Sequence, residues 1–211
     1  IAHITNVIGD IRPLKEIINY AHSLGILVVI DAAQSVPHHE INVSEMDVDF
    51  MAFSAHKMCG PTGVGVLYAK ENLLNDLKPI NLGGGMNEAF EVDGSFMLKE
   101  LPTRLEAGTP NIAGVIGFGE AIKYINKIGI NNIEKHTTEL KNYLITKLSA
   151  IPHINIINKN SNSSIVAFNV NGIFSQDVAF YLNKYHVCVR SGSHCAKILK
   201  DEIGVVNTLR I

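Results

Sequence analysis

The sequence lacks the features that mark several protein classes. No apolar run among its 211 residues reaches the roughly 18 that a membrane-spanning helix needs, and we expect no signal peptide. A net charge of −2 leaves no electrostatic footprint for nucleic acid or for an anionic membrane. Internal repeats and low-complexity segments are absent as well. We therefore expect a globular protein whose partners are neither nucleic acid nor membrane.

Cysteine is also scarce, with only Cys59, Cys188 and Cys195 in the chain. Three scattered cysteines cannot form a disulfide framework, so we expect a reducing, cytoplasmic environment. No Cys-x-x-Cys is present and the histidines lack ligand spacing, so no metal site is expected. The glycines at 83–85 are no dinucleotide fingerprint, because the pattern G-x-G-x-x-G is missing.

Strand and helix patterns alternate through the first hundred residues. The run 26–30 is rich in β-branched residues, a pattern typical of a strand buried on both faces. The alternation predicts an α/β fold with a mainly parallel sheet and helices on both faces. The predicted strands are 1–5, 26–30, 50–53 and 64–69, with a helix that begins at Pro13 and ends before Gly25.

The pattern changes near residue 130. The later segments predict a smaller α+β domain at 131–211, after a large domain at 1–130. Both ends of the chain, at Ile1 and Ile211, lie in strand-like runs, so we expect a chain truncated at both ends. The predicted helices are 112–128, 133–148 and 176–184, and the predicted strands are 154–157, 164–170 and 186–190.

Polar residues follow three of the predicted strands. Asn6 ends the first strand, Asp31 the second, and Ser54, His56 and Lys57 the third. In open parallel sheets ligands bind outside the carboxyl ends of the strands, so these residues are expected at one edge. An aspartate at a strand end is equally often a turn residue, and most lysines are solvated surface residues. Convergence of three such ends favours a ligand site.

Pyridoxal phosphate (PLP) suits this set of side chains. The cofactor requires a carboxylate that keeps its pyridine nitrogen protonated and a lysine that joins its aldehyde covalently. Asp31 and Lys57 supply these two groups, and Ser54 and His56 supply hydrogen-bond donors for the phosphate. Gln34 follows Asp31 by three residues, within reach of the phenolic oxygen of the ring.

Several segments resemble a known family. The runs 29–34 (Val-Ile-Asp-Ala-Ala-Gln), 53–58 (Phe-Ser-Ala-His-Lys-Met) and 60–63 (Gly-Pro-Thr-Gly) resemble the class V aminotransferase-like PLP enzymes of fold type I. The run 189–196 (Val-Arg-Ser-Gly-Ser-His-Cys-Ala) is similar to the active-site loop of cysteine desulfurases, particularly group II, the SUF type. The resemblance covers essentially the whole chain. It implies that the chain is the C-terminal portion of the family fold. Three positions depart from the family pattern: Ala55, Cys59 and Ser193.

The resemblance implies a role for each matching residue. Lys57 is the Schiff-base lysine and Asp31 the partner of the pyridinium nitrogen. The remaining cofactor ligands are Asn6 and Gln34 at the ring oxygen, Ser54 and His56 at the phosphate, and Thr109, which reaches a phosphate across a homodimer interface.

The same resemblance makes Cys195 the catalytic cysteine and Arg210 the arginine that binds the substrate carboxylate, with Arg190 in the same substrate-binding group. Arg190, His194 and Lys197 flank Cys195, and such groups stabilise a nucleophilic thiolate. Cys188 lies between two valines and is expected to be inert core.

The function that follows is conversion of L-cysteine to L-alanine, with the sulfur left as a persulfide on Cys195. An acceptor protein then takes the sulfur for iron–sulfur cluster assembly or other sulfur delivery. A selenocysteine lyase or another class V PLP enzyme is the nearest alternative, since it needs Asp31 and Lys57 but not Cys195. A non-catalytic interaction module is the remote alternative, and it would lack the visible absorption of the bound cofactor.

Overall fold

The computed structural model describes all 211 residues, and these form two compact units. The first unit comprises Ile1, Leu14–Pro37 and Ile41–Lys127. The second comprises Ala2–Pro13, His38–Glu40 and Ile128–Ile211. Two short segments from early in the chain therefore group with its C-terminal part. None of the helices is both long and apolar enough to cross a membrane.

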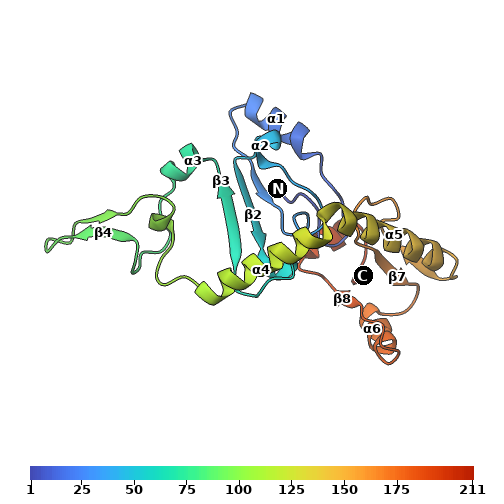
Figure 1. Cartoon of the computed structure of the whole chain (residues 1–211). Coiled ribbons are helices and arrows are strands. Elements are labelled where there is room, and N and C mark those ends of the chain that lie inside the picture. Colours follow the sequence, from blue (N-terminus) through green and yellow to red (C-terminus); the bar gives the residue numbers. More distant parts are fainter. The chain divides into compact units, whose positions relative to one another are not determined.

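The first unit is a mixed α/β unit built around a three-stranded sheet. Figure 1 shows β2 and β3 of this sheet side by side. Its helices are α1 (Leu14–Ser23), α2 (Val43–Met46), α3 (Glu71–Asp76) and α4 (Ile112–Ile128), with short 3-10 turns η1 (Ala55–Lys57) and η2 (Thr103–Leu105). Its strands are β1 (Val29–Asp31), β2 (Phe50–Ser54), β3 (Gly65–Ala69), β4 (Asn87–Phe90) and β5 (Phe96–Leu98).

The strand directions correct the prediction of a mainly parallel sheet. β1 and β2 pair in parallel, but β2 and β3 pair antiparallel, with Ser54 opposite Gly65. The reason lies in the connection, which is only residues 55–64. A parallel neighbour requires a crossover of about a dozen residues or more. The short turn after Ser54 therefore returns the chain antiparallel, and all other strand pairs of the molecule are antiparallel too.

The core of the first unit lies on one face of this sheet. Leu14 and Ile18 of α1 pack with Ile30 of β1 and Met51 of β2, and all four are buried. The other face carries Val29 and Leu67, whose side chains stay 55% and 54% exposed. The expected burial of both faces is therefore wrong for β1, where buried and exposed residues alternate.

An ionic cluster fastens β1 to the following segments. The Asp49 carboxylate is 2% exposed and accepts hydrogen bonds from the Val28 N–H (2.8 Å), the Lys70 Nζ (2.8 Å) and the His22 ring (2.7 Å). Asp47, at the surface, lies 2.6 Å from the same Lys70 nitrogen. Burial alone raises the pKa of Asp49, but the hydrogen bonds from Lys70, His22 and Val28 outweigh it, so that the pKa is lowered.

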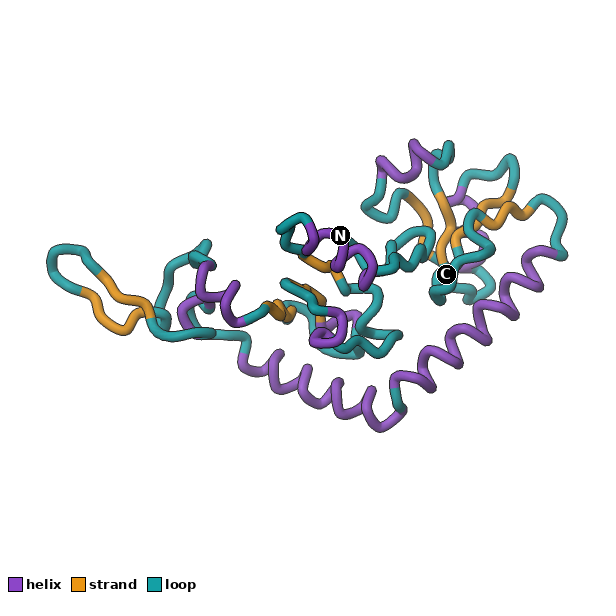
Figure 2. The backbone as a smooth tube through the Cα atoms, turned by 90° about the horizontal axis from the view of Figure 1, so that it is seen from above, coloured by secondary structure: helices purple, strands orange, loops and turns teal.

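The segment that the sequence leaves irregular, 83–110, contains a β-hairpin of β4 and β5. These strands pair antiparallel, and both views show the hairpin extending away from the three-stranded sheet (Figures 1 and 2). Gly94 closes its turn in the left-handed region (φ +87°). The hairpin presents several large apolar side chains to solvent: Phe90, Val92, Phe96 and Met97.

The second unit contains a four-stranded antiparallel sheet in the order β6-β7-β9-β8. Its core is formed by Ile156, Val166, Phe168 and Leu209, against which α5 packs Leu144. Its helices are α5 (Ile130–Ser149), α6 (Ser175–Asn183) and α7 (Lys197–Glu202). Its strands are β6 (Ile154–Ile156), β7 (Ala167–Val170), β8 (Arg190–Gly192) and β9 (Thr208–Arg210).

The last predicted strand, 186–190, begins later than expected. β8 starts only at Arg190, and Cys188 lies outside it and is exposed. The prediction of Cys188 as inert core is therefore wrong. The alternation of valine and cysteine resembles a buried strand, but α6 ends in a turn at Lys184–His186 and the chain reaches the sheet only after Cys188.

Candidate active site

The parallel pair β1 and β2 brings Asp31 and Ser54 to one end of the first unit's sheet. Asp31 pairs with Ala52, and Ser54 lies two residues further along β2. Because side chains alternate along a strand, Asp31, Ala52 and Ser54 share one face. This is the sparsely covered face that also carries Val29 and Leu67. A carboxylate and a hydroxyl are thus available at a carboxyl edge, the position where ligands bind in such sheets.

Lys57 and His56 follow at once in η1, and both are exposed. The six ion pairs of the molecule involve neither Asp31 nor Lys57. Asp31 Oδ1 accepts one hydrogen bond, from the Ala33 N–H at 2.9 Å. An uncommitted carboxylate, amine, hydroxyl and imidazole in one unit fit the chemistry that PLP requires of its site.

The other predicted cofactor ligands are more dispersed. Gln34 lies half-buried in the turn that follows β1, in the same unit as Lys57. Thr109 is exposed and follows Gly108. The Gly108 N–H donates to the Gly84 carbonyl (2.9 Å) and so holds the segment before Thr109 against the glycine-rich segment 83–85.

Asn6 departs from the expected arrangement. Residues 1–5 form no continuous strand, because Ile4 bridges back to Ile11 and only Ile1 hydrogen-bonds to β1. Asn6 belongs to the second unit, so it does not end a strand of the sheet that carries Asp31. Asn6 and Asp31 both follow an apolar run in the sequence, so the pattern alone does not distinguish their positions in the fold.

Cys195 lies in the second unit, in the turn between β8 and α7. It is exposed, and its backbone is in the left-handed region (φ +61°), as is that of His194 (φ +50°). Residues other than glycine rarely adopt this backbone conformation, since their Cβ atom then crowds the following carbonyl oxygen. The turn therefore presents the thiol to solvent on a strained loop.

Two arginines lie directly opposite each other beside this turn. Arg190 of β8 pairs with Arg210 of β9 in the antiparallel register. Burial lowers the pKa of Arg210, Arg190 lowers it further, and the Cys195 sulfur acts in the opposite direction. Like charges placed opposite each other on neighbouring strands are destabilising. The pair is therefore suited to an anionic ligand such as a carboxylate, which would neutralise it.

Asn6 connects these groups. Its Nδ2 donates to the His194 carbonyl at 2.7 Å, and its own carbonyl accepts a hydrogen bond from Arg210 Nη1. The partners are 188 and 204 residues away in sequence. The sequence suggests Asn6 as a cofactor ligand and contains no sign of this link, because nothing local to Asn6 indicates either partner.

His194 is a site residue that the sequence analysis named only as a neighbour of Cys195. It is 4% exposed, and its Nε2 lies 3.1 Å from the Thr208 carbonyl, which can only accept. Nε2 therefore carries the proton. Burial lowers the pKa of His194, the bond to Thr208 opposes this, and Arg210 and Arg190 lower the pKa further. The ring is thus a buried structural group, and the adjacent Cys195 is exposed.

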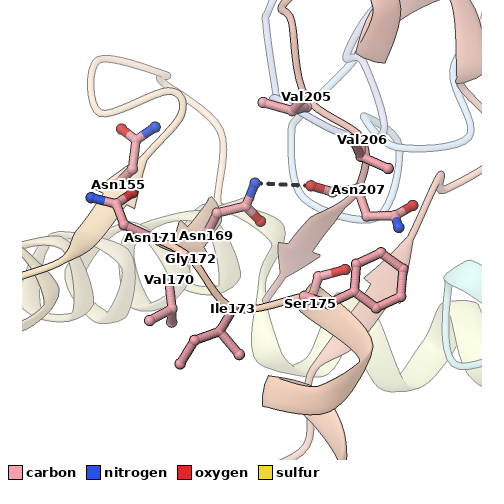
Figure 3. A pocket seen from close by; sticks show the side chains of 11 residues that line it. Asn155, Asn169, Val170, Asn171, Gly172, Ile173, Ser175, Val205, Val206 and Asn207 are labelled. Carbon is pink, nitrogen blue, oxygen red and sulfur yellow. Dashed lines mark hydrogen bonds between the residues drawn. The ribbon is translucent and has the colours of Figure 1, made fainter.

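A separate hollow of about 410 Å³ lies elsewhere in the second unit (Figure 3). Four amide side chains line it, and Asn169 Nδ2 donates to the Asn207 carbonyl at 2.8 Å. None of the residues singled out from the sequence lines this hollow, which holds no charged side chain. The four are Asn155, Asn169, Asn171 and Asn207.

Comparison with known proteins agrees with this chemistry. The family model described as aminotransferase class-V matches residues 1–211, and the family is PLP-dependent. A probable cysteine desulfurase of Halalkalibacterium halodurans is 42% identical over 210 residues, which cover 100% of this chain and 52% of that protein. A cysteine desulfurase of Shigella sonnei is 40% identical over 93% of this chain and 48% of its own length. The chain thus spans about half the length of the curated relatives it matches.

Solved structures match the fold over the same extent. The cysteine desulfurase CsdA of Escherichia coli, in its S-sulfonic acid form, superposes with a TM-score of 0.95 at 38% identity. The match covers 99% of this chain and 52% of that one. The apo cysteine desulfurase of Thermococcus onnurineus gives a TM-score of 0.94, also at 38% identity, over 99% of this chain and 53% of its own.

Proposed function

We propose, since this chain belongs to the aminotransferase class-V family, that it supplies the cofactor lysine and the sulfur-accepting cysteine of a cysteine desulfurase. The observation that carries the proposal is the second unit's arrangement of an exposed Cys195 beside the opposed Arg190 and Arg210. A nucleophilic thiol next to a carboxylate-binding pair is what transfer of sulfur from an amino acid requires. The relatives at about 40% identity support the same activity.

The first unit would hold the cofactor. Lys57 would join it covalently, Asp31 would face its pyridine nitrogen, and Ser54 and His56 would donate hydrogen bonds to its phosphate. When bound, PLP supplies an electron sink that allows the bonds around the α-carbon of an amino acid to break. The remaining ligands in this unit would be Gln34 at the ring oxygen and Thr109 at a phosphate.

The second unit would take the sulfur. Arg210, with Arg190, binds the carboxylate of L-cysteine and so fixes the substrate sulfur relative to the protein. Lys57 moves the proton at the α-carbon. The Cys195 thiolate attacks the substrate sulfur, a sulfur–sulfur bond forms as the carbon–sulfur bond breaks, and the electron pair left on carbon takes up a proton. The products are a persulfide on Cys195 and L-alanine.

The proposed partners are a sulfur-acceptor protein and a second copy of the chain. The persulfide on an exposed cysteine is accessible to an acceptor, which would pass sulfur to iron–sulfur cluster assembly or other sulfur delivery. The hairpin of β4 and β5 supports a homodimer, because Phe90 and Val92 are 70% and fully exposed on it. Thr109, in the same unit, would then reach the partner's cofactor phosphate.

The test compares Cys195→Ala with Cys188→Ala in the complete protein. Both cysteines are exposed, so the two variants remove the same group from similar solvent exposure. Cys195→Ala is expected to stop alanine formation from L-cysteine, while Cys188→Ala keeps the wild-type rate. After brief exposure to L-cysteine, mass spectrometry should find one added sulfur atom on the peptide that contains Cys195.

Full activity of Cys195→Ala on L-cysteine would exclude the desulfurase. A variant that lost activity on L-cysteine but retained it on L-selenocysteine would still agree with the proposal, since selenium is the better leaving group and needs no thiol. Alanine formation from L-cysteine without added sulfur on Cys195 would favour a lyase with no sulfur relay, and activity on L-selenocysteine alone would favour a selenocysteine lyase.

A further inference from the structure

The turn that carries Cys195 needs support from outside itself. His194 and Cys195 are consecutive non-glycine residues with positive φ, at +50° and +61°. Such conformations persist only where the surrounding structure holds them. Within the turn, a single backbone hydrogen bond, from the Ala196 N–H to the Ser193 carbonyl (2.9 Å), is present. The conformation of Cys195 therefore depends on contacts with other segments.

Two such contacts act on His194. Asn6 Nδ2 donates to its carbonyl at 2.7 Å, and this carbonyl belongs to the peptide unit that joins His194 to Cys195. The hydrogen bond therefore fixes the orientation of the peptide plane that precedes the Cys195 Cα atom. On the other side, the His194 ring donates to the Thr208 carbonyl on β9 (3.1 Å), two residues before Arg210.

Asn6 also binds Arg210. Its main-chain carbonyl accepts a hydrogen bond from Arg210 Nη1 on β9. One residue thus binds both the peptide unit before Cys195 and the arginine of the neighbouring strand. Fastening the segment Ala2–Pro13 to the rest of the unit does not require Asn6. Asn158 Nδ2 donates to the Ile8 carbonyl, and Ser161 Oγ donates to the Gly9 carbonyl at 2.6 Å.

We propose that Asn6 is a positioning residue that keeps Cys195 in its strained backbone conformation. The proposal deepens the desulfurase assignment, on which its catalytic meaning rests. Without the Asn6 amide, the peptide unit between His194 and Cys195 relaxes to a common backbone conformation. The thiol is then no longer presented in the position that the turn gives it.

The experiment measures alkylation of each cysteine by iodoacetamide, with peptide mass spectrometry, across a range of pH. It uses the complete protein with and without bound cofactor, so that cofactor loss in a variant does not enter the comparison. Asn6→Ala is expected to slow alkylation of Cys195 about tenfold at each pH, because the turn no longer holds the thiol in its presented position. Cys59 and Cys188, both exposed, are references within the same molecule and should not change.

Asn158→Ala is the matched control, because it removes an amide-to-carbonyl bond to the same segment away from Cys195. It should leave the Cys195 profile at its wild-type position. An unchanged Cys195 profile in folded Asn6→Ala, or an equal slowing in Asn158→Ala, would overturn the proposal. If Asn6→Ala does not fold, the isosteric Asn6→Asp supplies the comparison, since it keeps the shape and the main-chain carbonyl but loses the donor.

The outcomes for the two proposals are separate. Persulfide on Cys195 in the wild type together with an unchanged alkylation profile in Asn6→Ala would leave the desulfurase intact and remove the role of Asn6. A slowed alkylation in a protein that forms no persulfide would do the reverse.

Discussion

The candidate residues of the first unit and those of the second are held in different ways. Asp31, Ser54 and Lys57 come from segments within 27 residues of one another, at the end of a parallel strand pair, and their side chains have few partners. Asn6 and Arg210 are 204 residues apart and are already hydrogen-bonded to each other. One site is assembled by local topology and keeps its polar groups uncommitted, while the other is assembled by long-range bonds.

The difference follows from what each site does. A cofactor site needs a small number of placed polar groups that are free of competing ion pairs. A nucleophilic side chain has one reacting atom, whose position must be set before the substrate arrives. The candidate groups of the second unit are held by hydrogen bonds, whereas Asp31 and Lys57 of the first unit form no ion pair.

The largest effect is expected from Lys57→Ala in the complete protein. Without the amine, no covalent link to the cofactor forms and no proton acceptor remains at the α-carbon, so turnover should decrease by at least about a thousandfold. Borohydride reduction followed by peptide mapping measures the link directly. In the wild type the reduced adduct should be on Lys57 and in the variant it should be absent.

Lys123→Ala is the control for that experiment. Lys123 is a 74%-exposed lysine of the same unit that pairs with Glu120 at 2.7 Å, and an exposed pair of this kind contributes little. It should keep both the adduct and the activity. An adduct on any lysine other than Lys57 in the wild type would refute the assignment of Lys57, and an adduct on a lysine of the second unit would also refute the contrast between the units.

The sequence predicts the elements better than their pairing. The helix at 112–128 is found with the same bounds, and strand β2 was predicted to within one residue, because periodicity and β-branched runs are local signals. The direction of β3 was wrong although the necessary information, a ten-residue connection, is visible in the sequence. The hairpin of β4 and β5 was missed because its short strands show no clear alternation.

Site residues divide along the same line. Motifs identify Asp31, Lys57 and Cys195 as candidates because their neighbours in sequence are also their neighbours in space. The bonds of Asn6 to His194 and Arg210 span almost the whole chain, so only the folded structure reveals them. The opposition of Arg190 and Arg210 likewise depends on strand register, which a single sequence does not specify.

A smaller effect is expected in the ionic cluster of Asp49. There the first unit, like the second, holds a polar group by hydrogen bonds from separate segments. Asp49→Asn replaces a buried carboxylate that accepts bonds from Lys70, His22 and the Val28 N–H. The variant should lower the local stability of β1 and β2 by about 2–3 kcal/mol, as for hydrogen bonds to a buried charged group. Hydrogen exchange of the peptides 26–31 and 48–54 measures this. Asp47→Asn, at the exposed end of the same cluster, should change exchange far less.

The pH dependence has a defined sign. Because the pKa of Asp49 is lowered in the folded state, its contribution is present above the ordinary aspartate pKa and is lost as pH falls through the folded value. Protection of peptide 26–31 should therefore decrease in acid in the wild type and vary less in Asp49→Asn. A wild-type cluster that kept its full protection well below the ordinary aspartate pKa would contradict this assignment.

The smallest effect tests whether the second unit gives up stability for function. Arg190 lies opposite Arg210, so Arg190→Ala removes a like-charge repulsion and should stabilise the β8–β9 pair by about 0.5 kcal/mol. Hydrogen exchange of the peptide 205–211 should slow accordingly.

The same variant should raise the KM for L-cysteine several-fold with little change in kcat, since Arg190 contributes attraction for the carboxylate and takes no part in bond breaking. Arg210→Ala should raise KM more strongly, because this variant removes the arginine proposed to bind the substrate carboxylate directly. It also removes the hydrogen bond from Arg210 to the Asn6 carbonyl. If Arg190→Ala left both the exchange rate and KM unchanged, the two arginines would be independent surface residues, and the second unit would be no more preorganised for an anion than the first is for its cofactor.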